Sequence, residues 1–156
     1  MSQLPPEVYS LIDAALAEDQ TFSDPTTGIL VPAEINGIGM LRAKAVGVLA
    51  GVDVVSAVFQ RVDSVVEVQP LMADGSSLSP GDDIIRVSGS AGSILRAERS
   101  ALKLLQRMSG IASDTNLYVQ AIQGCQARIV DTRKTVPGQR YLDKYAVRMG
   151  GGHNHR

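Results

Sequence analysis

ARIVDTRKTVPGQRYLDKYAVRMGGGHNHR, residues 127–156, is the stretch that decides the fold. Its apolar Ile129-Val130 pair predicts a short strand that breaks abruptly into charge. Pro137-Gly138 then starts a helix, whose apolar residues recur at helical spacing: Leu142, Tyr145, Ala146 and Met149. The glycines 150–152 end that helix, and a second strand is expected to start at Asn154. This order is the beginning of a βα repeat, so we expect the first elements of an α/β barrel here.

The preceding residues 94–123 predict one long helix. Its apolar stripe is expected to consist of Leu95, Leu102, Leu105 and Met108, with a kink at Ser109-Gly110.

The N-terminal part mixes helical and strand patterns. Residues 6–19 and 51–62 predict helices, the second with Val54, Val55, Val58 and Phe59 facing inward. Residues 37–48, 65–68 and 84–87 predict strands, while FSDPTTG, residues 22–28, predicts a turn. We therefore expect an α+β sandwich domain with a mostly antiparallel sheet over residues 1–110, followed by the start of an incomplete α/β barrel over residues 111–156.

Composition and charge narrow the class of protein. Hydrophobic residues make up 44% and charged residues 20% of the 156, as in soluble globular proteins. No apolar run reaches the roughly 18 residues that a membrane span needs, the N-terminus has no secretory pattern, and the single Cys125 fits a reducing cytoplasm. Residues 128–156 carry 7 Lys+Arg against 2 Asp+Glu, whereas residues 1–127 carry 8 against 14. A basic end with few aromatic residues favours a local anion site over a nucleic-acid surface.

The charged run after the first strand is the strongest candidate site. Side chains that follow a strand lie at the rim where α/β proteins bind ligands. Arg133 can hold a carboxylate or phosphate bidentately, and Lys134 adds a mobile point charge. A loop salt bridge between Asp131 and Arg133 is the alternative.

GGGHNHR, residues 150–156, is the second cluster. Three glycines in a row suggest that the backbone passes close to something, often a ligand. His153 and His155 would share a face of an extended chain, but two histidines do not make a metal site. We expect His155 and Arg156 to act as anion-binding donors, and we expect no protein-held metal in this chain.

Two further groups of charged residues fit a solvated surface as well as a binding role. Glu98-Arg99, near the start of the long helix, fits a solvated surface on pattern alone. Arg140, Lys144 and Arg148 share one helical face, where like charges repel, so they fit a solvated face or contact with an acidic partner chain.

Three segments together resemble one family. ERSALKLLQRMSGIAS and IVDTRKTVPGQRYLDKYAVRMGGGHNHR closely resemble quinolinate phosphoribosyltransferase, also called nicotinate-nucleotide pyrophosphorylase (carboxylating), and LAEDQTFSDPTT looks like a looser version of its acidic N-terminal motif. The resemblance runs through essentially the whole chain. It implies an enzyme of NAD synthesis that joins quinolinate to phosphoribosyl pyrophosphate with Mg²⁺, giving nicotinate mononucleotide, pyrophosphate and CO₂.

The resemblance also implies site residues. The quinolinate carboxylates would be held by Thr132, Arg133, Lys134, His155 and Arg156, with Arg133 and Lys134 also serving catalysis. Arg99 would reach the neighbouring subunit's site in a head-to-tail homodimer or higher homo-oligomer. The family continues into residues that bind the ribose, phosphate and Mg²⁺, so we expect these 156 residues to be inactive alone. Two alternatives stay open: a same-fold paralogue with another substrate, and a non-catalytic binding or dimerisation module.

Overall fold

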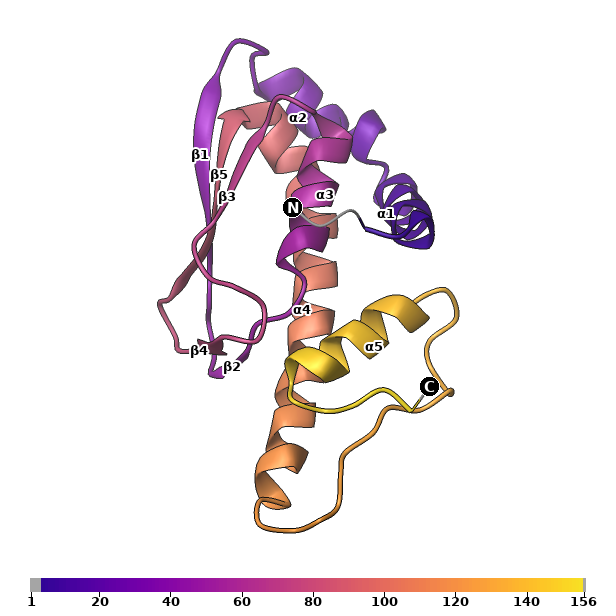
Figure 1. The fold of residues 1–156 in the computed structure, drawn as a ribbon. Helices are drawn as coiled ribbons and strands as arrows, with labels where there is room; N and C mark the ends of the chain where they lie inside the picture. The colour runs from indigo at the N-terminus through magenta and orange to yellow at the C-terminus, as the bar shows by residue number, and fades with distance from the viewer. Residues whose placement is uncertain (1–3, 156) are drawn as a thin grey trace.

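The computed structural model describes residues 4–155, which fold into helices around two small antiparallel sheets (Figure 1). The elements, in chain order, are α1 (Pro6–Glu18), the 3₁₀ turn η1 (Thr21–Ser23), α2 (Pro25–Leu30), β1 (Asn36–Arg42), β2 (Gly47–Val48), α3 (Val52–Val62), β3 (Glu67–Pro70), β4 (Ser77–Leu78), β5 (Asp83–Ser90), α4 (Ala91–Ala121) and α5 (Arg140–Met149). The expected α+β class is confirmed.

The main sheet has the strand order β1-β5-β3, and both pairings are antiparallel. A second, separate sheet consists of β2 and β4, which also pair antiparallel. Alternating burial along β1 reflects a strand with one face toward the helices and one toward solvent. On β5, Ile85 and Val87 turn to the helices and are fully buried. The expected mostly antiparallel sheet is therefore confirmed.

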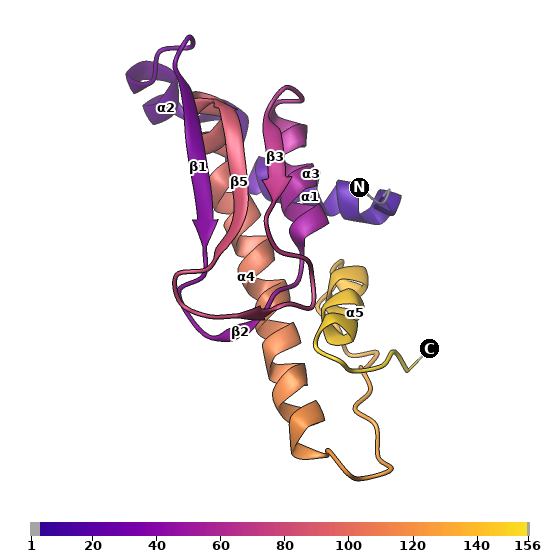
Figure 2. The same cartoon turned by 60° about the vertical axis from the view of Figure 1, so that its left-hand side comes forward.

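Helices α3 and α4 cover one face of this sheet, as the turned view in Figure 2 shows. The four residues of α3 expected to face inward are at most 3% exposed. Burying each such apolar side chain contributes roughly 1.5–3 kcal/mol, so this helix is a large part of the core's stability. In α4 the expected stripe is only half right, because Leu105 and Met108 are buried but Leu95 is 49% exposed. The buried side of α4 uses small residues instead, among them Ala97 and Ala101, which let α3 and the sheet pack closely.

The predicted turn at residues 22–28 is wrong in part, because the short helix α2 begins inside it at Pro25. Asp24 caps it: its carboxylate accepts the backbone N–H groups of Thr26 and Thr27 at 3.0 and 3.3 Å. Pro25 follows at the first helical position, where its missing N–H costs nothing. The Asp24-Pro25 pair thus starts a helix here, whereas its sequence pattern predicts a turn.

The C-terminal part packs against the second half of α4. This helix is assigned without a break through Ser109-Gly110, where the sequence predicts a kink. Ser109 Oγ instead accepts the backbone N–H of Ala50 at 3.1 Å, which ties the helix to the sandwich. In α5, Leu142 and Ala146 are buried against α4, as the periodicity predicted. The residues between the two helices cross back as an extended connection.

Candidate functional site

Two segments far apart in the sequence meet where the barrel was expected to begin. Val130 and His153 form a parallel bridge, and two backbone bonds of 2.9 Å flank it: His153 N–H to Ile129, and Asp131 N–H to His153. Each expected strand is therefore reduced to a single bridge. The direction is nevertheless that of neighbouring strands in a βα repeat. Because parallel strands end at the same edge, residues 131–134 and 154–155 emerge side by side.

Asp131 is the buried centre of this edge, with its side chain only 4% exposed. Its Oδ2 accepts the ammonium of Lys144 at 2.5 Å, and its Oδ1 accepts the backbone N–H of His155 at 2.7 Å. With its amide turned to match its neighbours, Asn154 donates to the same carboxylate at 3.1 Å. Burial acts to raise the pKa of Asp131, but the bonds from Lys144 and His155 outweigh it and hold that pKa below its usual range.

The cations predicted to bind an anion lie exposed beside this centre. Within residues 4–155 neither Arg133 nor Lys134 pairs with a carboxylate, and His155 is also exposed. Thr132 shapes the loop, since its Oγ1 accepts the backbone N–H of Lys134 at 3.1 Å. The alternative salt bridge between Asp131 and Arg133 does not form, because Asp131 is engaged by Lys144. Arg156 lies outside the described residues.

Lys144 corrects the expectation of a solvated cationic face on α5. Its side chain is only 18% exposed, since it turns inward to Asp131. Arg148, one turn on, lies over the ring of Tyr145 at 5.5 Å. Sequence spacing gave no signal for the Lys144 contact, because it joins residues 13 apart across an irregular loop.

Contacts with α4 and with the loop that carries Asp74 hold α5 in place. Asp143 accepts the guanidinium of Arg107 at 2.8 Å, and Tyr145 donates its hydroxyl to Asp74 at 2.7 Å. Burial, reinforced by the bond to Asp74, raises the pKa of Tyr145 well above its usual value. At the end of α5, Asn116 donates to the carbonyl of Gly150 at 3.3 Å.

The glycine run lies close against α4 and α5, so the close approach expected from the sequence is confirmed. A Cβ on Gly150 would lie 2.2 Å from the carbonyl oxygen of Ala112, and one on Gly152 would lie 2.7 Å from Val147. Gly151 between them has a φ of +88°, which favours glycine. These glycines bring the His153–His155 segment close to the helices behind it.

Arg99 lies elsewhere on the chain. It lines a polar cleft of about 330 Å³ between α4 and the η1–α2 segment, together with Asp19, Thr21, Asp24 and Arg96. None of residues 131–134 lines this cleft. The structure therefore brings together Thr132, Arg133, Lys134 and His155, but it does not add Arg99 to them within one chain.

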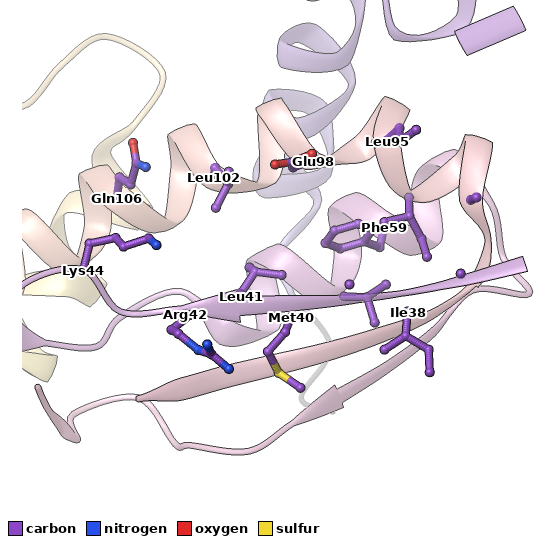
Figure 3. A pocket seen from close by; sticks show the side chains of 15 residues that line it. Ile38, Met40, Leu41, Arg42, Lys44, Phe59, Leu95, Glu98, Leu102 and Gln106 are labelled. Atoms are coloured by element: carbon purple, nitrogen blue, oxygen red, sulfur yellow. The ribbon is translucent and has the colours of Figure 1, made fainter. Parts of the chain in front are cut away.

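An apolar groove of about 520 Å³ runs between β1 and α4 (Figure 3). It is lined by Ile38, Leu41, Phe59, Leu95 and Leu102, with Lys44 and Glu98 at its margins. Glu98 thus faces a different surface from its neighbour Arg99. Its lining is mostly apolar, and its polar members are Arg42, Lys44, Glu98 and Gln106.

Metal binding and membrane spans have little support in the described part of the chain. Among residues 4–155, His, Cys, Asp and Glu side chains nowhere gather in the threes that a metal site needs. Over the same residues, no helix combines the length and apolar character required to cross a bilayer.

The structure thus combines an α+β domain with the beginning of a βα unit, and exposed cations lie at the strand ends of that unit. Comparison with known proteins identifies the family of the chain. The family model for the quinolinate phosphoribosyl transferase N-terminal domain matches residues 24–109, and that for the C-terminal domain matches residues 111–156. The chain belongs to the quinolinate phosphoribosyltransferase family.

Individual relatives agree along nearly the whole chain. The nicotinate-nucleotide pyrophosphorylase (carboxylating) of Mycobacterium leprae is 45% identical over 148 residues, which are 93% of this chain and 52% of that protein. The chloroplastic protein of the same name from Arabidopsis thaliana is 40% identical over 96% of this chain and 43% of its own length. The crystal structure of NadC from Streptococcus pyogenes superposes with a TM-score of 0.93 at 41% identity, covering all of this chain and 56% of its own. The chain thus spans about half the length of the relatives it matches.

Proposed function

We propose that this chain supplies the carboxylate-binding part of a quinolinate phosphoribosyltransferase acting in NAD biosynthesis. The reaction transfers phosphoribosyl from phosphoribosyl pyrophosphate to quinolinate and gives nicotinate mononucleotide, pyrophosphate and CO₂. The observation that carries the proposal is the meeting of Arg133, Lys134 and His155 at one edge, with both cations unpaired by carboxylates within residues 4–155. The names of the matched relatives support the same substrate class.

Quinolinate suits this edge because it carries two adjacent carboxylates on a flat ring. The planar guanidinium of Arg133 can grip one carboxylate with two parallel bonds, while the Lys134 ammonium reaches the other. His155, in its protonated form or through one N–H, adds a donor from the second segment. Arg156, although outside the described residues, follows His155 directly in the sequence and would contribute a further guanidinium group. Cations fixed on two backbone segments would hold the ring in one orientation.

The chemistry needs that orientation at two stages. The ring nitrogen attacks the anomeric carbon of the ribose, and the carbon–oxygen bond to pyrophosphate breaks with its electron pair leaving on pyrophosphate. The bond to the carboxylate beside the nitrogen then breaks and releases CO₂. Its electron pair stays on the ring carbon next to the now cationic nitrogen, and that carbon takes up a proton. Lys134 and Arg133 would stabilise the negative charge that develops there.

Magnesium belongs to the second substrate in this proposal. Residues 4–155 offer no cluster of carboxylates or histidines that fits a resident ion. The ion would arrive with phosphoribosyl pyrophosphate, whose oxygens are the hard ligands that Mg²⁺ prefers.

Arg99 enters the proposal through a second copy of the chain. It lies in a cleft of its own, away from Arg133, and so would serve a neighbouring site in a head-to-tail dimer or larger homo-oligomer.

We also propose a cytoplasmic location, because the single exposed Cys125 suits a reducing compartment.

Two other functions compete. A paralogue of the same fold could take another substrate; the human nicotinic acid phosphoribosyltransferase superposes with a TM-score of 0.57, but at 17% identity this likeness concerns the fold alone. A binding or dimerisation module would need no anion site. The unpaired cations at residues 133–134 favour a dicarboxylate ligand over both.

Calorimetric titration separates these functions. We expect heat of binding with quinolinate and much weaker binding of nicotinate, which lacks the second carboxylate. Arg133→Ala should abolish quinolinate binding, while Arg128→Ala, an exposed cation five residues earlier, should leave it unchanged. Equal binding of both ligands would favour the paralogue, and a stable dimer by light scattering without any heat would favour the module. Unimpaired binding by the Arg133 variant would refute the assignment.

A further inference from the structure

Asp131 is a built-in competitor for any anion at this site. It stands two residues before Arg133, and an aspartate can offer a guanidinium the same bidentate contact as a ligand carboxylate. On an extended segment, side chains two residues apart share a face. The structure removes this competition, because Asp131 turns away from Arg133 and is buried against Lys144 and the backbone of His155.

Lys144 is held by a rigid element, which lets it fix Asp131. The residues on either side of it in α5 are both anchored, Asp143 to Arg107 and Tyr145 to Asp74. Leu142 and Ala146 bury the same helix against α4. The anchored helix therefore fixes the ammonium beside Asp131, where the Lys144 side chain is only 18% exposed.

We propose that Lys144 and Asp131 are positioning residues for the dicarboxylate site. Lys144 sequesters the Asp131 carboxylate, which keeps the Arg133 guanidinium open for the ligand. Asp131, in turn, fixes the His155 segment beside Arg133 through the backbone N–H. Neither side chain touches the ligand. The inference rests on the proposed function only for the identity of that ligand.

Quinolinate affinity of four variants tests this arrangement. Lys144→Met releases Asp131 to pair with Arg133, and we expect affinity to fall about tenfold, within the usual range of coupling between neighbouring charges. Adding Asp131→Asn should restore affinity to within about threefold, because the amide oxygen still accepts the His155 N–H but attracts Arg133 little. Asp131→Asn alone should weaken binding by less than Lys144→Met does, because Arg133 stays open while the amide oxygen still accepts the His155 N–H. Arg140→Met, an exposed cation one turn earlier on α5, is the matched control and should change nothing.

Loss of positive charge or of stability alone predicts a different pattern. Either cause would leave the double variant as weak as Lys144→Met or weaker, and that result would overturn the inference. So would wild-type affinity in Lys144→Met, or a loss beyond tenfold in Asp131→Asn. The Asp131→Asn comparison stands by itself should Lys144→Met not fold.

A ligand-free readout keeps the two proposals apart. In the Lys144→Met chain, the Nε–H signal of Arg133 in an NMR spectrum should exchange with water more slowly than in the wild type or the double variant. Absence of quinolinate binding to the wild type would refute the proposed function. An unchanged Arg133 signal would refute the positioning role whatever the ligand proves to be.

Discussion

Removing the carboxylate of Asp74 should loosen the link between the sandwich and α5. One oxygen, Oδ1, accepts the backbone N–H groups of Gly51 and Val52 at 2.9 and 3.1 Å and so caps α3. The other, Oδ2, accepts the Tyr145 hydroxyl at 2.7 Å. Losing a helix cap costs about 1 kcal/mol, and leaving the half-buried Tyr145 hydroxyl without its acceptor adds about 1–2 kcal/mol. We therefore expect Asp74→Ala to lower the free energy of unfolding by about 2–3 kcal/mol.

Urea unfolding followed by circular dichroism measures this loss, and a double-mutant cycle with Tyr145→Phe apportions it. The two single variants should not be additive, because each removes the same hydroxyl–carboxylate bond. Asp82→Ala is the matched control: this partly exposed loop aspartate accepts a backbone N–H from Ser79 at 2.8 Å, and its loss should cost well under 1 kcal/mol. A loss below about 0.5 kcal/mol in Asp74→Ala, or full additivity in the cycle, would refute the reasoning.

Further predictions concern the glycine run, the stability of the chain at acid pH and the cap of α2. Gly150→Ala should destabilise the chain by about 3 kcal/mol or more because its Cβ meets the backbone of Ala112, whereas Gly110→Ala, with open space at its Cβ inside α4, should stabilise it by about 0.5–1 kcal/mol; equal urea midpoints would contradict this. The pKa of Asp131 is lowered in the folded chain, so its contribution is present above the unfolded value near 3.8 and is lost as the pH falls through the folded value. Acid unfolding of Asp131→Asn should accordingly show a shallower loss of stability below about pH 4, and an unchanged slope would speak against the buried ion pair. Asp24→Ala should melt α2 at a cost of about 1 kcal/mol, read as lost amide protection at Thr26 and Thr27; retained protection would show that the cap is dispensable.

Local periodicity was enough to predict most elements. The apolar spacing of α1, α3 and α5 predicts the buried residues Ile12, Val58 and Leu142 correctly, since each helix packs only one stripe on a shared core. The alternating and β-branched runs likewise became an antiparallel sheet. The charged run at residues 131–135 lies beside the His155 segment, because strand ends of a βα unit lie at one edge.

Contacts between segments could not be predicted in the same way. Nothing in the sequence spacing indicates that Lys144 pairs with Asp131, because that ion pair depends on how α5 packs on α4. The glycine run indicates a close approach, but its spacing does not indicate that the backbone of Ala112 is the neighbour of Gly150. Leu95 fits the helical stripe, yet it lies at the groove beside β1 because small residues take the buried face of α4.

The central claim is that the edge formed by residues 131–134 and 153–155 binds a dicarboxylate. The most direct measurement is titration of the ¹⁵N-labelled chain with quinolinate, followed through its backbone amide signals. The account predicts that the signals of Thr132, Arg133, Lys134 and His155 shift together and saturably, while those of Ile38 and Leu102 in the apolar groove stay fixed. Unmoved signals at the edge, or shifts confined to the groove, would contradict it.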